Sequence, residues 1–443
     1  MATTLTTPTF LEDRFVRAFE ANEGITLNGS NANIHGVRRA AMDAFQTLGF
    51  PKPKVEAWKY TNISRVLRGD FGLALSPTSH GLTAEDIDGM LIPDLDAHLI
   101  VLVNGRYDAG LSRIGELPEG VIVTNFAHAS EQYADLVNAH FAQYAKYKEE
   151  SFAALNTAFA QDGYFVYVPK NVIFETPVVV LHVLTGGDSL FIQPRSLFVV
   201  ERSAQATVIE LKQSTTEVPM FTNAVTEVYV GANAKADHYQ VQEEAATQHQ
   251  VTYLEAYQER DSYFSTHTET FSGGTVRNNL GLLPNDENIE THLIGLFLCN
   301  GTMHVDNHTL VDHAMPNCMS NELYKGILDD KSVGVFNGKV FVRQDAQKIN
   351  AYQTNKTIVL TEQAKMYSKP ELEIYADDVQ CSHGATTGQI EDEAMFYLMA
   401  RGIPPKRARA LLLLAFARDV LDTVEVEPLA DYLDGLINAR FDA

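Results

Sequence analysis

The chain has 443 residues, of which 45% are hydrophobic and 21% are charged, a composition that is typical of folded proteins and excludes a largely disordered one. Single hydrophobic cores stop growing at roughly 250–300 residues, so we expect two or three packed units. The formal net charge of −23 repels phosphate backbones and anionic head groups, which argues against nucleic acid and membrane surfaces as partners.

The N-terminal region is predicted to begin with two helices. Apolar residues recur at helical spacing in Phe10–Ala21 and in Val37–Leu48, and Gly49 and Pro51 end the second helix. Met1–Pro8 is polar and lacks the apolar stretch of a leader peptide. Because no run approaches the roughly 20 apolar residues of a membrane span, we expect a cytoplasmic protein.

A short hairpin and further helices follow. His98–Val103 is an apolar run that meets an Asn-Gly pair at 104–105, which is a strong signal for a two-residue hairpin turn. Gly120–Thr124 is another short strand candidate, and Phe126–Phe159 returns to helical spacing. We therefore predict that residues 1–160 form a mostly helical region with a short strand hairpin.

Residues 161–390 carry a different pattern, in which short strand-length segments alternate with turns. No helix-length periodic segment interrupts them, which argues against βαβ units. Segments of this kind, rich in Val, Ile, Phe and Thr, are Leu197–Glu201, Ala206–Leu211, Ala224–Val230, Leu293–Leu298 and Ser332–Phe336.

Weak internal repeats distinguish between the all-β folds. Ser203–Ala206 recurs as Asn233–Ala236 and, more loosely, as Gln363–Met366. Asn300–Val305 matches Asn337–Val342 at the Asn, the Gly and the final Val. Repeated strand-and-corner units favour a β-solenoid over a sandwich or jelly roll, because each coil buries its apolar face on its neighbours. We predict a mainly β fold, a parallel β-helix flanked by N-terminal and C-terminal helical regions.

Residues 391–443 are predicted to be helical again. Asp392–Arg401 ends at Gly402, a proline pair opens Lys406–Leu421, and a short third helix spans Ala430–Ile437. Five basic residues cluster near a very apolar stretch of this otherwise acidic chain: Arg401, Lys406, Arg407, Arg409 and Arg418. They form either a solvated helix face or a surface that docks into a partner's groove.

The three cysteines, Cys299, Cys318 and Cys381, are too few for a disulfide framework or for a self-contained four-thiolate site. Any cluster held by this chain would need ligands from elsewhere.

The strongest local candidate for chemistry is the segment around Cys381. If the strand that begins near Leu372 continues, Cys381 and His383 project to one side and Ser382 to the other. A thiolate and an imidazole side by side are both suitable ligands for iron. The alternative is a small buried cysteine and a turn histidine before Gly384.

A second group of potential ligands lies between residues 292 and 313. Its members are His292, His304, His308 and His313 with Asp306 and Asp312. His304 and His308 share a face in either a strand or a helix, so a zinc enzyme is one hypothesis. The segment lacks the His-Glu-x-x-His pattern of hydrolytic zinc sites, and polar rows are common on solenoid surfaces, so a structural or interface role is favoured.

Acidic pairs raise the possibility of a solenoid carbohydrate-active enzyme. The pairs are Asp329-Asp330 and Asp377-Asp378. Adjacent residues of a strand point to opposite faces, so neither pair supplies two cooperating carboxylates, and solvated turns are the favoured interpretation. No phosphate loop, nucleophile elbow or dinucleotide fingerprint is present.

Several segments together resemble the SufD family of the Suf (SufBCD) system for iron–sulfur cluster assembly. Residues 49–61 (GFPKPKVEAWKYT) are similar to the family's N-terminal signature, although Val55 and Ala57 replace more polar residues. Further similar stretches are Tyr324–Gly326, Val335–Lys339, Gln344–Gln347, Asn350–Gln353 and Leu372–Gly388. The Trp58 signature, and the absence of closely spaced cysteines near the N-terminus, favour SufD over a SufB-like paralogue.

The resemblance implies a right-handed parallel β-helix and a non-catalytic scaffold subunit. His383 matches a histidine that contributes to a nascent cluster at the interface with SufB, and Cys381 matches a neighbouring cysteine. The helices between Asp392 and Leu421 correspond to the region that docks the SufC ATPase. A reduced flavin is associated with the complex, at a position that the sequence does not indicate. A homodimer and a heterodimer with SufB both remain open, because one β-helix edge can serve either partner.

Overall fold

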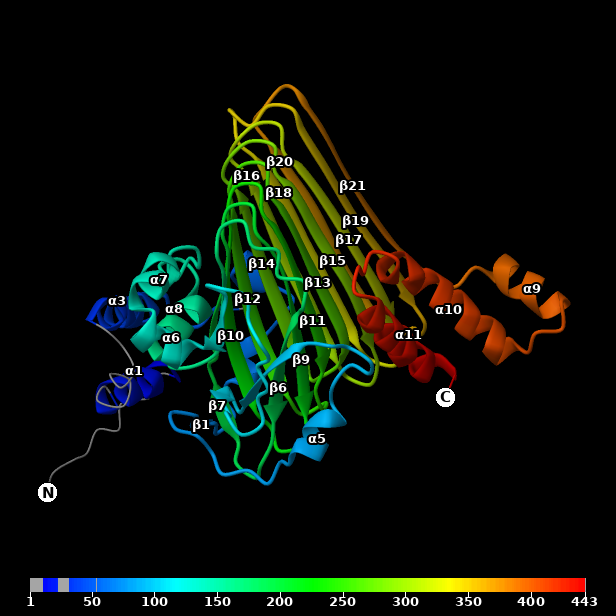
Figure 1. The fold of residues 1–443 in the computed structure, drawn as a ribbon. Coiled ribbons are helices and arrows are strands. Elements are labelled where there is room, and N and C mark those ends of the chain that lie inside the picture. Colours follow the sequence, from blue (N-terminus) through cyan, green and yellow to red (C-terminus); the bar gives the residue numbers. More distant parts are fainter. Residues whose placement is uncertain (1–10, 23–31, 53, 443) are drawn as a thin grey trace, which may run out of the picture.

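The computed structural model describes residues 11–22, 32–52 and 54–442, and it is dominated by two long sheets that face each other (Figure 1). The strands of the first sheet are β1 (Gly72–Leu73), β4 (Ile122–Asn125), β5 (Tyr164–Val168), β7 (Leu190–Ile192), β8 (Arg195–Val200), β10 (Phe221–Val230), β12 (His249–Gln258), β14 (Thr275–Pro284), β16 (His304–His313), β18 (Val333–Val342) and β20 (Lys365–Ile374). Those of the second are β2 (His98–Val103), β3 (Arg106–Tyr107), β6 (Val178–Leu184), β9 (Gln205–Ser214), β11 (Lys235–Glu243), β13 (Tyr263–Ser272), β15 (Glu290–Cys299), β17 (Met319–Leu328), β19 (Ile349–Val359) and β21 (Val379–Gly388).

From β8 onward the chain alternates between the sheets, and from β10 onward each strand pairs in parallel with the strand two places before it. Lys235, for example, pairs with Gln205 thirty residues earlier and with Tyr263 twenty-eight residues later. Each coil therefore adds one strand to each sheet. The predicted parallel β-solenoid is confirmed.

Only some of the internal sequence repeats occupy equivalent positions in the coils of the solenoid. Ser203 and Asn233 have φ of 57° and 59° at equivalent corners, and Ala206 pairs with Ala236. The second match is a coincidence of sequence, because Asn300 lies at a corner whereas Asn337 lies within β18, where it pairs with His308. The loosest copy, 363–366, leads into β20 of the other sheet.

The N-terminal helices cover the outer face of the first sheet. They are α1 (Leu11–Ala21), α3 (Ala32–Leu48), the short η1 (Glu56–Trp58), α4 (Ile63–Val66), α6 (Phe126–Gln132), α7 (Ala134–His140) and α8 (Ser151–Phe159). The short helix α5 (Ala84–Asp88) instead packs Ile87 against the outer face of the second sheet. An aromatic cluster joins α1 to the sheet, with the rings of Phe15 and Phe191 and those of Phe191 and Phe221 both 4.9 Å apart between centroids.

These elements match most of the predicted ones. Phe10, where the first predicted helix begins, and residues 1–8 lie outside the described residues. The predicted helical stretch 126–159 is interrupted between α7 and α8. The hairpin β2–β3 is confirmed, with Asn104 and Gly105 both at positive φ, as a two-residue turn requires.

Three helices follow the last strand: α9 (Asp392–Ala400), α10 (Pro405–Leu421) and α11 (Glu427–Asp442). Leu413 and Val420 of α10 belong to one buried cluster with Leu296 and Ile327 on the outer face of the second sheet. By contrast, α9 buries none of its residues and projects away from the solenoid (Figure 1). Among the described residues, no helix combines the length and the apolarity that crossing a membrane requires.

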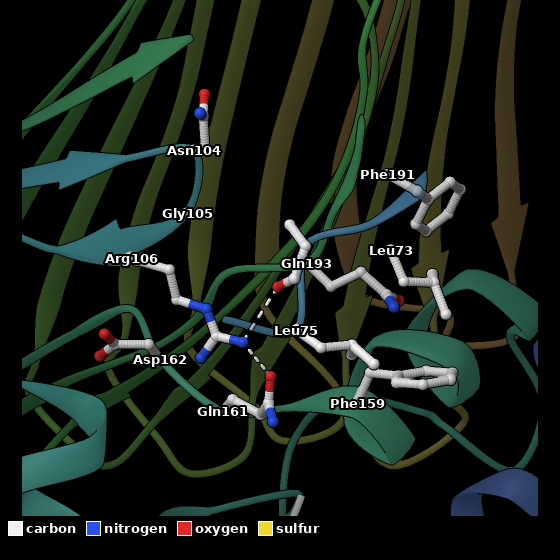
Figure 2. A pocket seen from close by; sticks show the side chains of 11 residues that line it. Leu73, Leu75, Asn104, Gly105, Arg106, Phe159, Gln161, Asp162, Phe191 and Gln193 are labelled. Carbon is white, nitrogen blue, oxygen red and sulfur yellow. Dashed lines mark hydrogen bonds between the residues drawn. The ribbon is translucent and has the colours of Figure 1, made fainter. Parts of the chain in front are cut away.

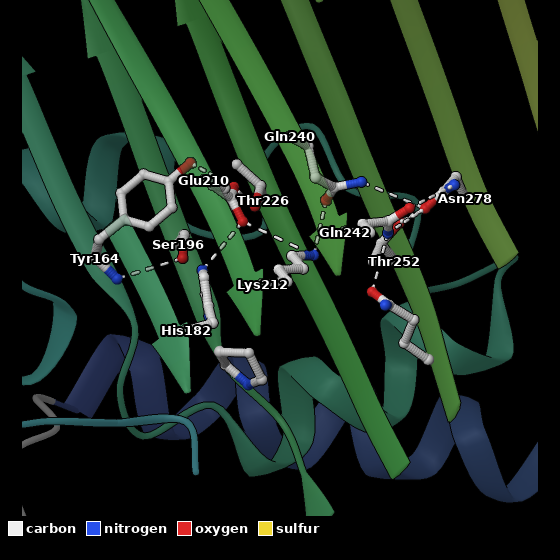
Figure 3. A network of polar contacts seen from close by, with 12 residues as sticks. Tyr164, His182, Ser196, Glu210, Lys212, Thr226, Gln240, Gln242, Thr252 and Asn278 are labelled. Atoms are coloured by element: carbon white, nitrogen blue, oxygen red, sulfur yellow. Dashed lines mark hydrogen bonds and ion pairs between the residues drawn. The ribbon is translucent and has the colours of Figure 1, made fainter. Parts of the chain in front are cut away.

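The interior between the sheets is apolar at one edge and polar along an adjoining row. Phe198, Leu280 and Phe336 contribute to the apolar cluster. In the polar row, Glu210 lies 3.1 Å from a ring nitrogen of each of His182 and His238 (Figure 3). The row continues through Tyr164, Lys212, Gln240, Gln242, Thr252 and Asn278. Buried polar groups are tolerated here because they satisfy one another.

A buried carboxyl in this interior makes the free energy of unfolding depend on pH. Glu322 is 1% exposed, and burial raises the pKa of its carboxyl from 4.5 to about 7, although Thr309 and Gln353 donate hydrogen bonds to it. The folded state therefore binds more protons than the unfolded state between these two values, and stability falls as the pH rises through this window.

We expect the free energy of unfolding of the wild type, relative to that of Glu322→Gln, to fall by up to about 3 kcal/mol between pH 4.5 and pH 8. Urea unfolding of both proteins at several pH values measures this difference. The exposed Glu362→Gln is the control and should show no such trend. A difference between wild type and Glu322→Gln that stays constant with pH would contradict the prediction.

Candidate functional site

The last coil of the solenoid is uncovered. In the described part of the chain, β20 pairs only with β18 and β21 pairs only with β19, so both end their sheets. Each strand therefore presents a free edge of N–H and C=O groups, which is a template for pairing with another chain. The interior of the solenoid also opens at this end.

Cys381 and His383 lie on β21, at this open end. They are in register with Ala351 and Gln353 of β19, which are 0% and 1% exposed and face the interior. Ser382 pairs instead with the exposed Tyr352 on the outer face. The strand spacing thus predicted correctly that Cys381 and His383 share one face.

The two side chains differ in their surroundings. Cys381 packs in a small cluster that includes Val342 and Ala376, and burial raises the pKa of its thiol. The side chain of His383 is exposed at the mouth of the solenoid. The histidine is therefore accessible to a ligand or a second chain, whereas the cysteine is half covered.

The residues present do not complete a metal site by themselves. Within residues 11–22, 32–52 and 54–442, no three His, Cys, Asp or Glu side chains are grouped closely enough to hold a metal ion. Cys299 and Cys318 are buried at other places, where burial raises the pKa of their thiols to about 12 and about 11. A thiol and an imidazole are both suitable donors to iron, but two such donors are fewer than an iron–sulfur cluster requires.

The histidines of residues 292–313 do not converge, so they do not form one metal centre. His304 and His308 share the outer face of the first sheet, as predicted. His313 points into the interior, 2.9 Å from the hydroxyl of Ser320, and His292 lies on the second sheet, 2.8 Å from Glu290. The carboxylate of Asp312 forms an ion pair with Arg343. The structure therefore supports a structural role for these histidines and not a shared metal site.

An N-terminal clasp, residues 56–61, holds part of this group. The hydroxyl of Thr61 lies 2.9 Å from the ring of His304 and 2.5 Å from a carboxylate oxygen of Asp306. The guanidinium of Arg277 also pairs with Asp306, and it stacks on Trp58 at 3.8 Å from the ring centroid. The single Trp thus pins the N-terminal region to the solenoid.

The clasp reaches the last coil as well. Tyr60 stacks on Tyr367 of β20 with ring centroids 4.3 Å apart, and Glu56 pairs with Lys369 of the same strand at 2.6 Å. Because β20 belongs to the last coil, the clasp ties the N-terminal region to the end of the solenoid that carries His383.

The acidic pairs lie in turns. Asp330 has a φ of 53°, and its carboxylate accepts a hydrogen bond from the backbone N–H of Gly301 at 2.8 Å. Asp377 and Asp378 lie in the exposed connection between β20 and β21. The interpretation of both pairs as solvated turns is confirmed, and neither pair forms a two-carboxylate site.

The basic cluster near the C-terminus divides into two parts. Arg401 stacks on Tyr397 of α9, and Lys406, Arg407 and Arg409 are exposed in the first turns of α10. Arg418 lies in the last turn of α10 and pairs with Asp422 and Asp434 at 2.9 and 3.4 Å. Its charge is therefore compensated within the chain.

Exposed apolar side chains on α9 are a feature that the sequence analysis missed. Phe396 is 71% exposed, Tyr397 58% and Met399 43%. Monomeric proteins rarely leave such a patch in water, so it indicates an interaction site. The available signal was the apolar run 394–400, which surrounds the helix instead of forming the single stripe of a core-facing helix.

A pocket beside the β2–β3 turn is too small for a ligand (Figure 2). Its volume is about 10 Å³, which is room for one water molecule. Arg106 fills it by donating to the carbonyl of Ala74 at 3.0 Å and to the side chain of Gln161, beside the carboxylate of Asp162. These contacts fasten the hairpin to the N-terminal region.

Comparison with known proteins supports one family. Residues 182–416 match the family described as "SUF system FeS cluster assembly, SufBD core domain", and residues 10–180 match "SufBD protein N-terminal region". A SufBD family iron–sulfur cluster assembly protein of Synechocystis is 31% identical over 416 residues, covering 91% of this chain and 90% of that protein. SufD of Escherichia coli is 29% identical, covering 88% of this chain and 89% of that one, and SufD of Bacillus subtilis 26% identical, covering 92% and 94%.

Proposed function

Because the chain belongs to the SufBD family of iron–sulfur cluster assembly proteins, we propose that it is a SufD-type, non-catalytic scaffold subunit in the cytoplasm. In this role it contributes one side of a site on which a cluster is built and then released. The observation that carries the proposal is the half-complete ligand set, His383 with Cys381, at the uncovered last coil.

The missing ligands come from a SufB-type paralogue that pairs with β20 and β21. Two free strand edges and the exposed Tyr352, Tyr375 and Ile374 lie at this end and suit a second β-helix end to end. A second copy of this chain could occupy the same edges as a homodimer. Only a thiolate-rich partner completes an iron site, since this chain offers one thiol there.

A SufC-type ATPase docks on α9 and the start of α10. The apolar patch of α9 stands beside the exposed basic residues Arg401, Lys406, Arg407 and Arg409, and together they resemble an apolar anchor with a basic rim. A pocket of about 350 Å³ adjoins it, lined mainly by apolar residues such as Ile390, Leu412 and Phe416.

Movement of the ATPase reaches the cluster site through the second sheet. Lys325 of β17 donates to the carbonyl of Phe416 at 2.7 Å and pairs with Asp419, both on α10. β17 pairs with β19, which pairs with β21. Closure of two ATPase subunits would therefore strain the end that carries His383, as a two-state coupling between rigid bodies. The reduced flavin expected in the complex has no assigned position on this chain.

The deciding experiment is co-expression with a SufB-type paralogue and a SufC-type ATPase, followed by subunit, iron and sulfide counting on the purified complex. We expect a complex that holds both partners and binds a cluster. A chain that purifies alone and never associates with either partner would overturn the proposal.

The docking surface yields a separate prediction. We expect Phe396→Ala to weaken binding of the ATPase by about 30-fold or more, because truncating a central aromatic anchor costs about 2 kcal/mol or more. Titration calorimetry with the isolated ATPase measures this. Tyr133→Ala, which truncates a 38% exposed ring on the N-terminal region, is the matched control and should bind like the wild type. Equal affinity of both variants would exclude α9 from the interface.

A further inference from the structure

The interior face of the second sheet ends in a row of three polar side chains that leads to the solenoid mouth. Glu322 of β17 is in register with Gln353 of β19, which is in register with His383 of β21. Neighbouring strands of a sheet lie about 4.8 Å apart, so side chains in register on one face are within contact distance. The first two members of the row are each 1% exposed, whereas His383 is exposed.

The amide of Gln353 is fixed by its surroundings. Its Nε2 donates to Oε2 of Glu322 at 2.6 Å. Glu322 is held in turn by Thr309, whose hydroxyl donates to its other oxygen. On the opposite sheet, Gly338 leaves room for the amide, because a Cβ at that position would lie 2.5 Å from Nε2 of Gln353. The nitrogen of the amide is therefore directed toward Glu322 and its oxygen away from it.

That oxygen is left without a donor. Oε1 of Gln353 is buried and has no hydrogen-bond partner within the described residues. A buried carbonyl oxygen without a donor is costly. On the neighbouring strand β21, the polar residue in register with Gln353 is His383. An imidazole N–H is the donor that could satisfy it by a side-chain rotation.

We infer that Gln353 is a positioning residue for His383, in which its Oε1 accepts one ring N–H of the imidazole and leaves the other ring nitrogen free to bind iron. Metal-binding histidines commonly donate their second ring N–H to an acceptor of this kind, which fixes both the tautomer and the ring orientation. Glu322 acts one step further back by setting the direction of the Gln353 amide. The inference rests on the proposed function in one respect, that His383 binds iron.

The test is the tautomer ratio of His383 in protein labelled with ¹⁵N-histidine, measured by NMR without iron at pH 8.5. The signal is assigned by its absence in His383→Gln. We expect the ratio of the two N–H tautomers to change at least about threefold between the wild type and Gln353→Met, which keeps the chain length and removes the acceptor. Gln353→Glu keeps an acceptor and should retain the ratio of the wild type.

Two controls keep the result interpretable. Gln380→Met changes an exposed glutamine of β21 that faces away, and should leave the ratio unchanged. Glu322→Met leaves Gln353 in place but frees its amide to rotate, so it should shift the tautomer ratio in the same direction as Gln353→Met. If Gln353→Met fails to fold, Glu322→Met replaces it as the test variant. An unchanged ratio in whichever of these two folds overturns the inference.

The same variants in the co-expressed complex separate this inference from the proposed function. A shifted ratio together with about 10-fold to 100-fold weaker cluster retention in Gln353→Met supports both. If the ratio shifts in Gln353→Met but the wild-type chain never binds a cluster, the orientation of His383 by Gln353 is supported and the proposed function is overturned. An unchanged ratio with normal cluster binding overturns the inference alone.

Discussion

Replacing His383 with alanine is expected to lower the cluster content of the purified complex at least about tenfold while leaving the fold intact. Loss of a direct ligand should cost no less than loss of a group that supports one, which lowers metal affinity about 10-fold to 100-fold. The fold should be spared because the imidazole is exposed at the last strand and forms no part of the buried clusters. Iron and sulfide assays, with the visible absorbance of the complex, measure the effect.

Neighbouring residues supply the controls for that experiment. Ser382→Ala removes an exposed side chain from the opposite face of β21 and should leave the cluster content unchanged. Cys381→Ala tests whether the half-covered thiol takes part, because an equal loss in this variant would assign it as a second ligand. If His383→Ala instead prevents folding or association with the partners, the histidine is structural.

The largest effect on stability is expected at Arg195, which is 0% exposed and pairs with Glu227, itself 1% exposed. The guanidinium also donates to the hydroxyl of Thr157 at 2.7 Å. The carboxylate of Glu227 accepts three further bonds from backbone N–H groups between α7 and α8, among them those of Ala142 and Tyr144 at 2.7 and 2.8 Å. This one pair therefore joins the helical region to the first sheet.

We expect Arg195→Met to lower the free energy of unfolding by about 3–5 kcal/mol, because it leaves the buried carboxylate of Glu227 without its counter-charge. Urea unfolding followed by circular dichroism measures the loss. The matched control is Arg260→Met, which breaks a surface pair with Asp261 and should change stability little. Similar losses in the two variants would show that burial does not set the strength of the Arg195 pair.

Much of the fold followed from local patterns. The corner at 203–206 and its repeat at 233–236 predicted a solenoid correctly, because each corner places one residue at positive φ before a strand of fixed register. The match between 300–305 and 337–342 failed, because an Asn-Gly pair serves equally at a corner and in a strand where the glycine makes room for a neighbour. Sequence similarity at so few positions cannot distinguish the two uses.

The candidate site was predictable only where it depended on strand period. That Cys381 and His383 share a face follows from alternation along one strand. Their different exposure depends on the absence of a further coil, and the position of Gln353 depends on pairing with a strand thirty residues away. Neither this difference in exposure nor the position of Gln353 can be predicted from the neighbouring sequence alone. The place of His292 on the second sheet likewise required the path of the coil, whereas the inward direction of His313 follows from alternation along β16.

The N-terminal clasp also bears on the order in which the molecule is made. Its contacts join residues that are far apart along the chain, up to the 313 positions between Glu56 and Lys369. Domains form during synthesis from the N-terminus, so the coils can stack one after another on the ribosome while residues 56–61 wait for their partners. The contacts of Trp58 and Thr61 can form once β16 has been translated, but the clasp closes fully only after β20 has been translated. Closure is therefore a late step that distinguishes a finished chain from a truncated one.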